Sequence, residues 1–268
     1  MPEEGQRRRQ PTSSLAWEEA GQGTLVVLLH GFPLCREIFL PVMPALAEVG
    51  RVVAVDLPGF GHSPPLPSGF SLEQVAAEVA DLVAGLAAEP MVLVGHSMGG
   101  YVALALARQH PERLKGLVLL ASHPRADAPE ARQRREEGIA LLRQGRRKEF
   151  LEAFLARLLG PWSRQHAPRL LAEVRAMAEL VSSQVLVDYL AAMRDRPDHQ
   201  DTWQALGVPS WVVVGEEDPL IGRELAEATA AAARQGRLVT IPQAGHLPTL
   251  ERPIVTAETL ARCVLEAG

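Results

Sequence analysis

Short apolar runs rich in valine and leucine recur along the first half of the chain and again near its end. Runs of this length without polar interruption are typical of strands buried on both faces of a parallel sheet. They predict strands at residues 14–20, 25–30, 51–55, 91–94, 117–121, 210–214 and 238–241.

Between these runs, apolar residues recur at helical spacing. Ser71 and Gln74 form a capping box at the start of one such stretch. The pattern predicts helices at 38–49, 72–88, 101–108, 220–234 and 254–266. Strands that alternate with helices indicate an α/β fold, with a mostly parallel central sheet flanked by helices.

The alternation stops between residues 122 and 202, where only helical spacing remains. We expect three to five helices there, inserted into the α/β pattern as a cap. The predicted organisation is a flexible polar tail at 1–14, a core at 15–121 and 203–268, and a helical cap at 122–202. Arginines cluster in this insertion, and a solvated helix face explains them more simply than an anion site does.

Composition narrows the possible partners. The 268 residues are 47% hydrophobic, enough for one large domain with an insertion, and the net charge of −5 gives no reason to expect nucleic acid or an anionic membrane. Cys35 and Cys263 stand far apart without metal-like spacing, so neither a disulfide framework nor a metal site is expected. No secretory leader or membrane span is evident, which favours a cytoplasmic protein.

The stretch from Gly95 to Gly99 reads Gly-His-Ser-Met-Gly, between a buried strand and a buried helix. In this G-x-S-x-G pattern a serine occupies a strained strand-to-helix turn, which exposes its hydroxyl above the helix N-terminus. Ser97 is therefore a candidate nucleophile.

A nucleophilic serine needs a base and a carboxylate that orients the base. Asp218 and His246 each follow a predicted strand, so both should lie at the same sheet edge as Ser97. Glu216 and Glu217 compete with Asp218, which we favour because it comes late in the turn and precedes a proline.

The backbone N–H groups of Met98 and Phe32 are the candidate oxyanion hole, one following the nucleophile and the other in the loop after an earlier strand. His30 is expected to shape that loop. Phe32, His96, Trp162 and Leu247 are the candidate substrate-binding residues, with Trp162 among the apolar cap residues expected to roof the cleft.

Five short motifs together resemble the α/β-hydrolase superfamily: His-Gly-Phe-Pro at 30–33, Asp-Leu-Pro-Gly-Phe-Gly-His-Ser at 56–63, Gly-His-Ser-Met-Gly-Gly at 95–100, Gly-Glu-Glu-Asp at 215–218 and Gly-His at 245–246. The resemblance implies the α/β-hydrolase fold, with the insertion at the position of that family's cap. Within the superfamily the chain is similar to small capped carboxylesterases of the pimeloyl-ester-esterase type, although the turn that carries Ser97 reads Gly-His-Ser where that group often has Gly-Trp-Ser. It is also similar to the haloperoxidase and perhydrolase branch and to C–C bond hydrolases.

The sequence therefore predicts a serine hydrolase that cleaves a small to medium acyl ester through an acyl-enzyme, as a monomer or homodimer without cofactor or metal. Two alternatives stay open. One is a ligand-sensing signalling protein on the same fold. The other is a lyase, C–C hydrolase, perhydrolase or acyl transferase that uses the same three residues.

Overall fold

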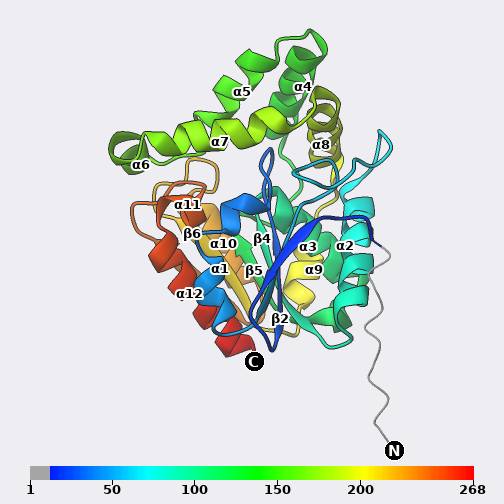
Figure 1. Ribbon diagram of the computed structural model, residues 1–268, viewed down its shortest axis with the longest axis vertical. Helices are drawn as coiled ribbons and strands as arrows, with labels where there is room; N and C mark the ends of the chain where they lie inside the picture. Colours follow the sequence, from blue (N-terminus) through cyan, green and yellow to red (C-terminus); the bar gives the residue numbers. More distant parts are fainter. Residues whose placement is uncertain (1–12) are drawn as a thin grey trace, which may run out of the picture.

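A seven-stranded sheet runs through the centre of the computed structural model, which describes residues 13–268 (Figure 1). Its strands follow the order β1-β3-β2-β4-β5-β6-β7, and only β1 pairs antiparallel, with β3. The mostly parallel α/β-hydrolase architecture predicted from the sequence is thereby confirmed. The strands are β1 Trp17–Ala20, β2 Leu25–Leu29, β3 Arg51–Val55, β4 Met91–His96, β5 Leu114–Leu120, β6 Ser210–Gly215 and β7 Gly236–Ile241.

Helices cover both faces of the sheet (Figure 1). On one face, α1 packs against α12, and on the other α2, α3, α9 and α10 pack in succession. A capping box of Ser71 and Gln74 starts α2, as predicted. The bounds are α1 Met43–Ala47, α2 Leu72–Leu86, α3 Met98–Gln109, α9 Gln200–Ala205, α10 Arg223–Ala232, α11 Pro248–Glu251 and α12 Pro253–Ala267, with short 3-10 helices η1 Arg36–Phe39 and η2 Pro111–Arg113.

The predicted helix at 38–49 is wrong in its extent, because the structure breaks it into η1 and the five-residue α1. Pro41 lies in the gap, where it has no N–H to donate to a continuous helix. Pro44 is tolerated because it stands in the first turn of α1, where the N–H would have no partner anyway.

Five helices occupy the segment between β5 and α9, and they lie together above the carboxyl ends of the strands (Figure 1). They are α4 Pro129–Arg143, α5 Arg147–Leu155, α6 Pro161–His166, α7 Arg169–Leu180 and α8 Ser183–Asp195. We call these five helices, with the segments that connect them, the cap. The predicted tail at 1–14 falls almost entirely outside the described residues.

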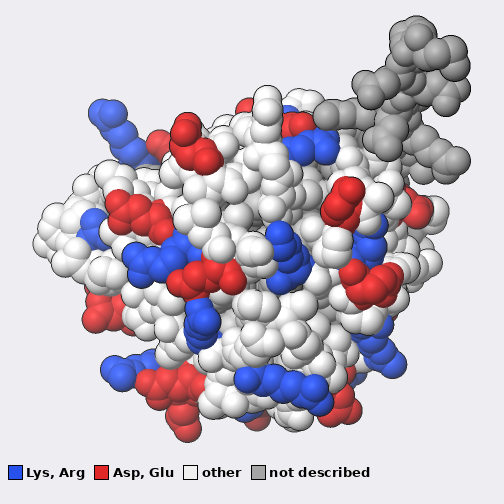
Figure 2. Space-filling model, turned by 90° about the horizontal axis from the view of Figure 1, so that it is seen from below, with Lys and Arg blue, Asp and Glu red and all other residues white. Residues whose placement is uncertain are grey.

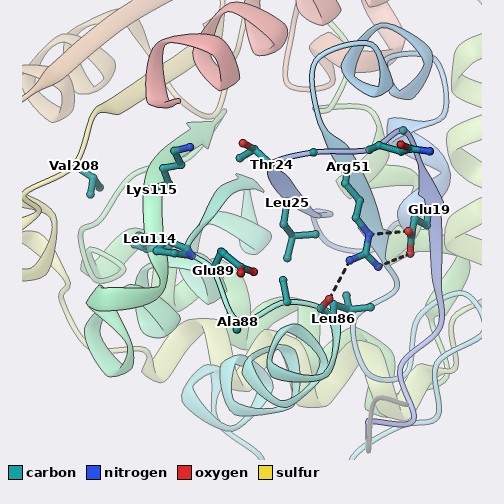
Figure 3. Close-up of a pocket in the computed structure, with 15 residues that line it drawn as sticks. Glu19, Thr24, Leu25, Arg51, Leu86, Ala88, Glu89, Leu114, Lys115 and Val208 are labelled. Carbon is teal, nitrogen blue, oxygen red and sulfur yellow. Dashed lines mark hydrogen bonds and ion pairs between the residues drawn. The ribbon is translucent and has the colours of Figure 1, made fainter. Parts of the chain in front are cut away.

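The face opposite the cap has acidic and basic side chains interspersed (Figure 2). A hollow of about 1280 Å³ opens at the amino ends of the strands, where Arg51 pairs with Glu19 and donates to the carbonyl of Leu86 (Figure 3). The described residues that line it include no serine, cysteine or histidine. Among residues 13–268, no helix is long and apolar enough to cross a membrane.

Candidate active site

The sequence forces a strained turn between β4 and α3. Ser97 has φ 50° and ψ −115°, a conformation that few non-glycine residues adopt, and α3 begins at the next residue. Such a turn needs small neighbours, since a Cβ on Gly99 would lie 2.2 Å from the carbonyl oxygen of Leu29. The turn lies beside the point where the strand order reverses between β2 and β4, where ligands gather in open α/β sheets.

Three side chains from loops after β4, β6 and β7 meet at this edge. His246 Nε2 lies 2.9 Å from Ser97 Oγ, and His246 Nδ1 lies 2.9 Å from Asp218 Oδ2. Because Nδ1 donates its proton to the carboxylate, the lone pair of Nε2 is left to accept the Ser97 hydroxyl. The structure thus brings together the three candidate catalytic residues in the geometry of a nucleophile, a base and an orienting acid.

The loop after β6 separates the three acids that compete in the sequence. Asp218 is buried against His246, and its Oδ1 accepts the backbone N–H groups of Leu220 (2.8 Å) and Ile221 (3.1 Å). Glu216 instead accepts the N–H of Gln243, and Glu217 that of Trp162. Of these three carboxylates, Asp218 is the one that hydrogen-bonds to His246.

His30 holds the loop after β2 that carries Phe32. Its Nε2 accepts the N–H of Leu57 at 3.0 Å, so its proton is on Nδ1, which donates to the carbonyl of Gly31 at 3.1 Å. Burial lowers the pKa of His30 to about 4, which keeps the ring neutral near pH 7. The structure thus gives His30 the loop-shaping contacts expected from the sequence.

The two candidate oxyanion donors flank the Ser97 turn. Met98 is the first residue of α3, so its N–H has no partner within the helix. Phe32 belongs to the loop after the neighbouring strand β2, and its side chain lines the cavity that contains Ser97. One N–H therefore begins helix α3 and the other lies in the loop after β2, and both border the nucleophile.

A cavity of about 270 Å³ lies over Ser97 and His246, between the core and the cap. Its aromatic wall is formed by Phe32 with Phe150 and Phe154 of α5, with ring centroids 5.3 to 6.3 Å apart. Leu190, Met193 and Ile221 add further apolar surface. The polar lining, which we call the polar wall, consists of His123, Asp127, Arg134, Arg135 and Arg157.

Three of the four candidate substrate-binding residues lie elsewhere. Trp162 stacks on His166 and under the guanidinium of Arg252, 3.5 Å from the ring centroid, and so does not roof the cavity. Leu247 is fully buried in the core, because its loop turns inward at α11. Only Phe32 lines the cavity as expected.

His96 is also buried and has a supporting position instead. Its Nε2 donates to the carbonyl of His246 at 2.7 Å, which anchors the backbone of that residue. Burial, with a smaller effect of His246, lowers the pKa of His96 to about 3, so the ring is neutral near pH 7. His96 is not among the described residues that line the cavity.

Glu251 is a further residue of the site that the sequence reasoning missed. This buried carboxylate accepts the N–H groups of Gly245 (2.9 Å) and Leu247 (3.0 Å), the two neighbours of His246, and that of Gly160 in the cap (2.8 Å). The N–H of His246 itself donates to Leu158 of the cap. Glu251 therefore ties the loop that carries His246 to the segment between α5 and α6.

In the part of the chain that the structure describes, no group of three or more histidine, cysteine, aspartate or glutamate residues could hold a metal ion. The chemistry available at this edge is that of Ser97, His246 and Asp218 with backbone N–H donors. A parallel sheet with these groups after its strands, in the chain order serine, aspartate, histidine, defines the α/β-hydrolase class.

Comparison with known proteins agrees with this class. Residues 24–253 match the model of the alpha/beta hydrolase fold family. A pimeloyl-[acyl-carrier protein] methyl ester esterase from Edwardsiella ictaluri is 32% identical over 247 residues, which cover 90% of this chain and 93% of that protein. The chain belongs to the α/β-hydrolase fold family and is a hydrolase of the esterase type.

Solved structures show the same relationship. A thermophilic esterase from Thermogutta terrifontis, solved with malate bound, superposes with a TM-score of 0.88 and 35% identity, over 94% of this chain and 93% of that one. A bromoperoxidase from Bacillus anthracis shares the fold at 21% identity, with a TM-score of 0.84 over 94% of this chain and 95% of that chain.

Proposed function

We propose that the protein is a serine carboxylesterase that cleaves small to medium acyl esters through an acyl-enzyme intermediate. The observation that carries this proposal is the hydrogen-bonded chain from Ser97 through His246 to Asp218, with both distances 2.9 Å, in which Ser97 and His246 line a partly apolar cavity. The curated relative named as a methyl ester esterase supports the choice of an ester as substrate.

In the first half of the reaction, Ser97 Oγ attacks the ester carbonyl while His246 Nε2 takes the hydroxyl proton. The carbonyl oxygen becomes negative and accepts the N–H groups of Phe32 and Met98. Asp218 stabilises the protonated His246, which then gives its proton to the departing alcohol as the carbon–oxygen bond breaks.

In the second half, a water molecule gives a proton to His246 and attacks the acyl carbon of the Ser97 ester. The same two N–H groups stabilise the negative oxygen again. Collapse of this intermediate returns the proton to Ser97 Oγ and releases the carboxylic acid. No metal or cofactor is needed at any step of this scheme.

A series of p-nitrophenyl esters tests the substrate class. Because the cavity measures about 270 Å³ and has Phe150 and Phe154 in its lining, kcat/KM should rise from acetate to butyrate or hexanoate and then fall as the acyl chain outgrows the space. Each buried CH₂ contributes up to about 0.8 kcal/mol, so the rise should be at most about 4-fold per CH₂. The amount of p-nitrophenol released should exceed the amount of protein many times over.

Two cap variants make this test specific. Phe154→Ala should move the optimum toward longer chains, whereas Trp162→Phe should leave it unchanged because Trp162 lies outside the cavity. Rates independent of chain length, or an optimum that Phe154→Ala does not move, would contradict a substrate pocket at this place. A single turnover followed by changed affinity for another protein would favour a ligand sensor instead.

Glu251→Gln tests whether Glu251 holds the loop that carries His246, the proposed base. The amide keeps one acceptor oxygen but replaces the other by a donor that faces backbone N–H groups, so either the hydrogen bond from Gly160 or the two from Gly245 and Leu247 are lost, and the tie between the His246 loop and the segment before α6 is broken. We expect kcat to fall about 10-fold, equivalent to about 1.4 kcal/mol, with KM nearly unchanged. The rate of fluorophosphonate labelling, measured well below the melting temperature, should fall in parallel.

Glu258→Gln is the matched control, since Glu258 is exposed on α12 and should not affect either rate. If Glu251→Gln lowered the melting temperature but left kcat and the labelling rate unchanged, Glu251 would stabilise the fold without positioning His246.

A further inference from the structure

The polar wall of the cavity carries more positive charge than its acidic residue can balance. Arg134 of α4 and Arg157, just after α5, both line the cavity, and no carboxylate of the described residues pairs with either. The chain as a whole has a net charge of −5, so this local excess of cations runs against its overall charge. It needs a separate explanation.

Among the described residues that line the cavity, Asp127 is the only acidic one, and its two oxygens are already occupied. Oδ1 accepts Arg196 at 2.6 Å, and Oδ2 accepts Arg135 at 3.2 Å. Burial acts to raise the pKa of Asp127, but Arg135 and Arg196 outweigh it and hold the pKa below its ordinary value. Asp127 therefore neutralises those two arginines and not Arg134 or Arg157.

The nearby histidine does not change this balance. Burial, with a smaller effect of Arg196, lowers the pKa of His123 to about 4, so the ring is neutral near pH 7. Burial also lowers the pKa of Arg157, and the positive charges of Arg134 and Arg135 lower it further, although a guanidinium stays protonated. Arg134 and Arg157 thus lie near each other at the cavity, and no carboxylate of the described residues neutralises either.

We propose that Arg134 and Arg157 bind an anionic carboxylate or phosphate group of the substrate, so that the preferred esters carry a negative charge remote from the ester bond. A guanidinium presents planar pairs of N–H donors that match the oxygens of such groups. The ester would lie at Ser97, the hydrocarbon part against Phe32, Phe150 and Phe154, and the anionic end at the two arginines. This inference rests on the proposed esterase function.

Methyl esters of equal length and different charge test it. Monomethyl adipate and methyl 5-phosphonopentanoate carry an anion at the far end, dimethyl adipate is neutral there, and methyl 6-aminohexanoate is cationic. We expect kcat/KM to be about 10-fold to 100-fold higher for at least one of the anionic esters than for the neutral ester, because hydrogen bonds to charged groups are strong. The cationic ester should be the poorest substrate. The adipate series carries its charge on the acyl side of the ester bond. 4-Acetoxybutanoate and its methyl ester give the same comparison with the charge on the alcohol side of the acetyl ester.

The variants Arg134→Gln and Arg157→Gln, singly and together, should raise KM for the anionic esters, and the double variant should bring the ratio of kcat/KM between the anionic esters and dimethyl adipate to about 1. Arg143→Gln is the matched control, because Arg143 is exposed on the same helix α4, lies outside the cavity and changes the net charge equally. An effect of Arg143→Gln as large as that of Arg134→Gln would mean long-range attraction and would overturn a local site.

Binding gives a readout that does not depend on turnover. Titration of the Ser97→Ala variant with monomethyl adipate should give a dissociation constant at least about 10-fold lower than with dimethyl adipate, and the added Arg134→Gln and Arg157→Gln substitutions should abolish the difference. If no ester of any charge is cleaved by the unaltered protein, the proposed esterase function fails. If esters are cleaved but neutral and anionic ones equally well in both series, only the anion site fails.

Discussion

Ser97→Ala should lower kcat by at least about 10³-fold for any ester that the protein cleaves, while the fold stays intact. The substitution removes the oxygen that attacks the carbonyl, and what remains is the catalysis that the oxyanion hole and substrate binding supply. The hydroxyl makes one hydrogen bond, to His246, so the free energy of unfolding should change by about 1 kcal/mol or less. Steady-state rates and a denaturant titration measure the two effects separately.

Fluorophosphonate labelling ties this result to the residue. The probe should label the unaltered protein once, on Ser97, and should not label Ser97→Ala. Ser183→Ala in the cap is the matched control, because Ser183 is only half-buried and lies outside the cavity, and it should keep the original kcat. If Ser97→Ala retained more than a tenth of the activity, the proposed mechanism would be wrong.

The meeting of Ser97, His246 and Asp218 at one edge of the sheet could be predicted from the sequence because it follows from the strand topology. Apolar runs locate the strands, and parallel strands bring their carboxyl ends to one edge, so residues just after 94, 214 and 241 have to converge. The turn at Ser97 adds a local constraint. Gly95 and Gly99 have no Cβ, so neighbouring backbone can approach them as closely as this turn requires. Neither step requires knowledge of side-chain direction.

The lining of the cavity could not be anticipated in the same way. Helical spacing predicts that the cap contains helices, but it does not say which apolar residue faces the core and which faces another helix. The sequence therefore predicts equally that Trp162, Phe150 and Phe154 line the cavity. In the structure Phe150 and Phe154 line it, whereas Trp162 packs on Arg252. Orientation of the cap depends on contacts between segments far apart in the chain.

Glu251 and Arg157 were missed for a related reason. Nothing local distinguishes a glutamate that accepts three backbone N–H groups from a solvated one, although its position five residues after His246, at the end of a short proline-led helix, is a usable signal. The arginines of the insertion did stand out, and a solvated helix face was the simpler interpretation. Arg134 differs from Arg143 only through which side of α4 faces the cavity.

Asp218→Asn should lower kcat by up to about 10⁴-fold with little change in KM or in folded structure. An asparagine side chain can donate its N–H to His246 Nδ1, which then favours the tautomer with its proton on Nε2, and that ring cannot accept the proton of Ser97. The side-chain oxygen can still accept the N–H groups of Leu220 and Ile221, so the turn after β6 should persist. Steady-state kinetics and circular dichroism on the same preparation measure both expectations.

Glu217→Gln and Glu216→Gln are the controls that the structure provides, since both carboxylates lie in the same turn and neither contacts His246. Glu217 accepts the N–H of Trp162, so its amide variant should loosen the contact between the turn and the cap and cost less than about 10-fold in kcat. Glu216 accepts the N–H of Gln243 at an exposed position, and its variant should be close to the unaltered protein. Equal losses in Glu217→Gln and Asp218→Asn would move the orienting acid to Glu217, whereas a large loss confined to Asp218→Asn is the outcome required by a carboxylate 2.9 Å from the base.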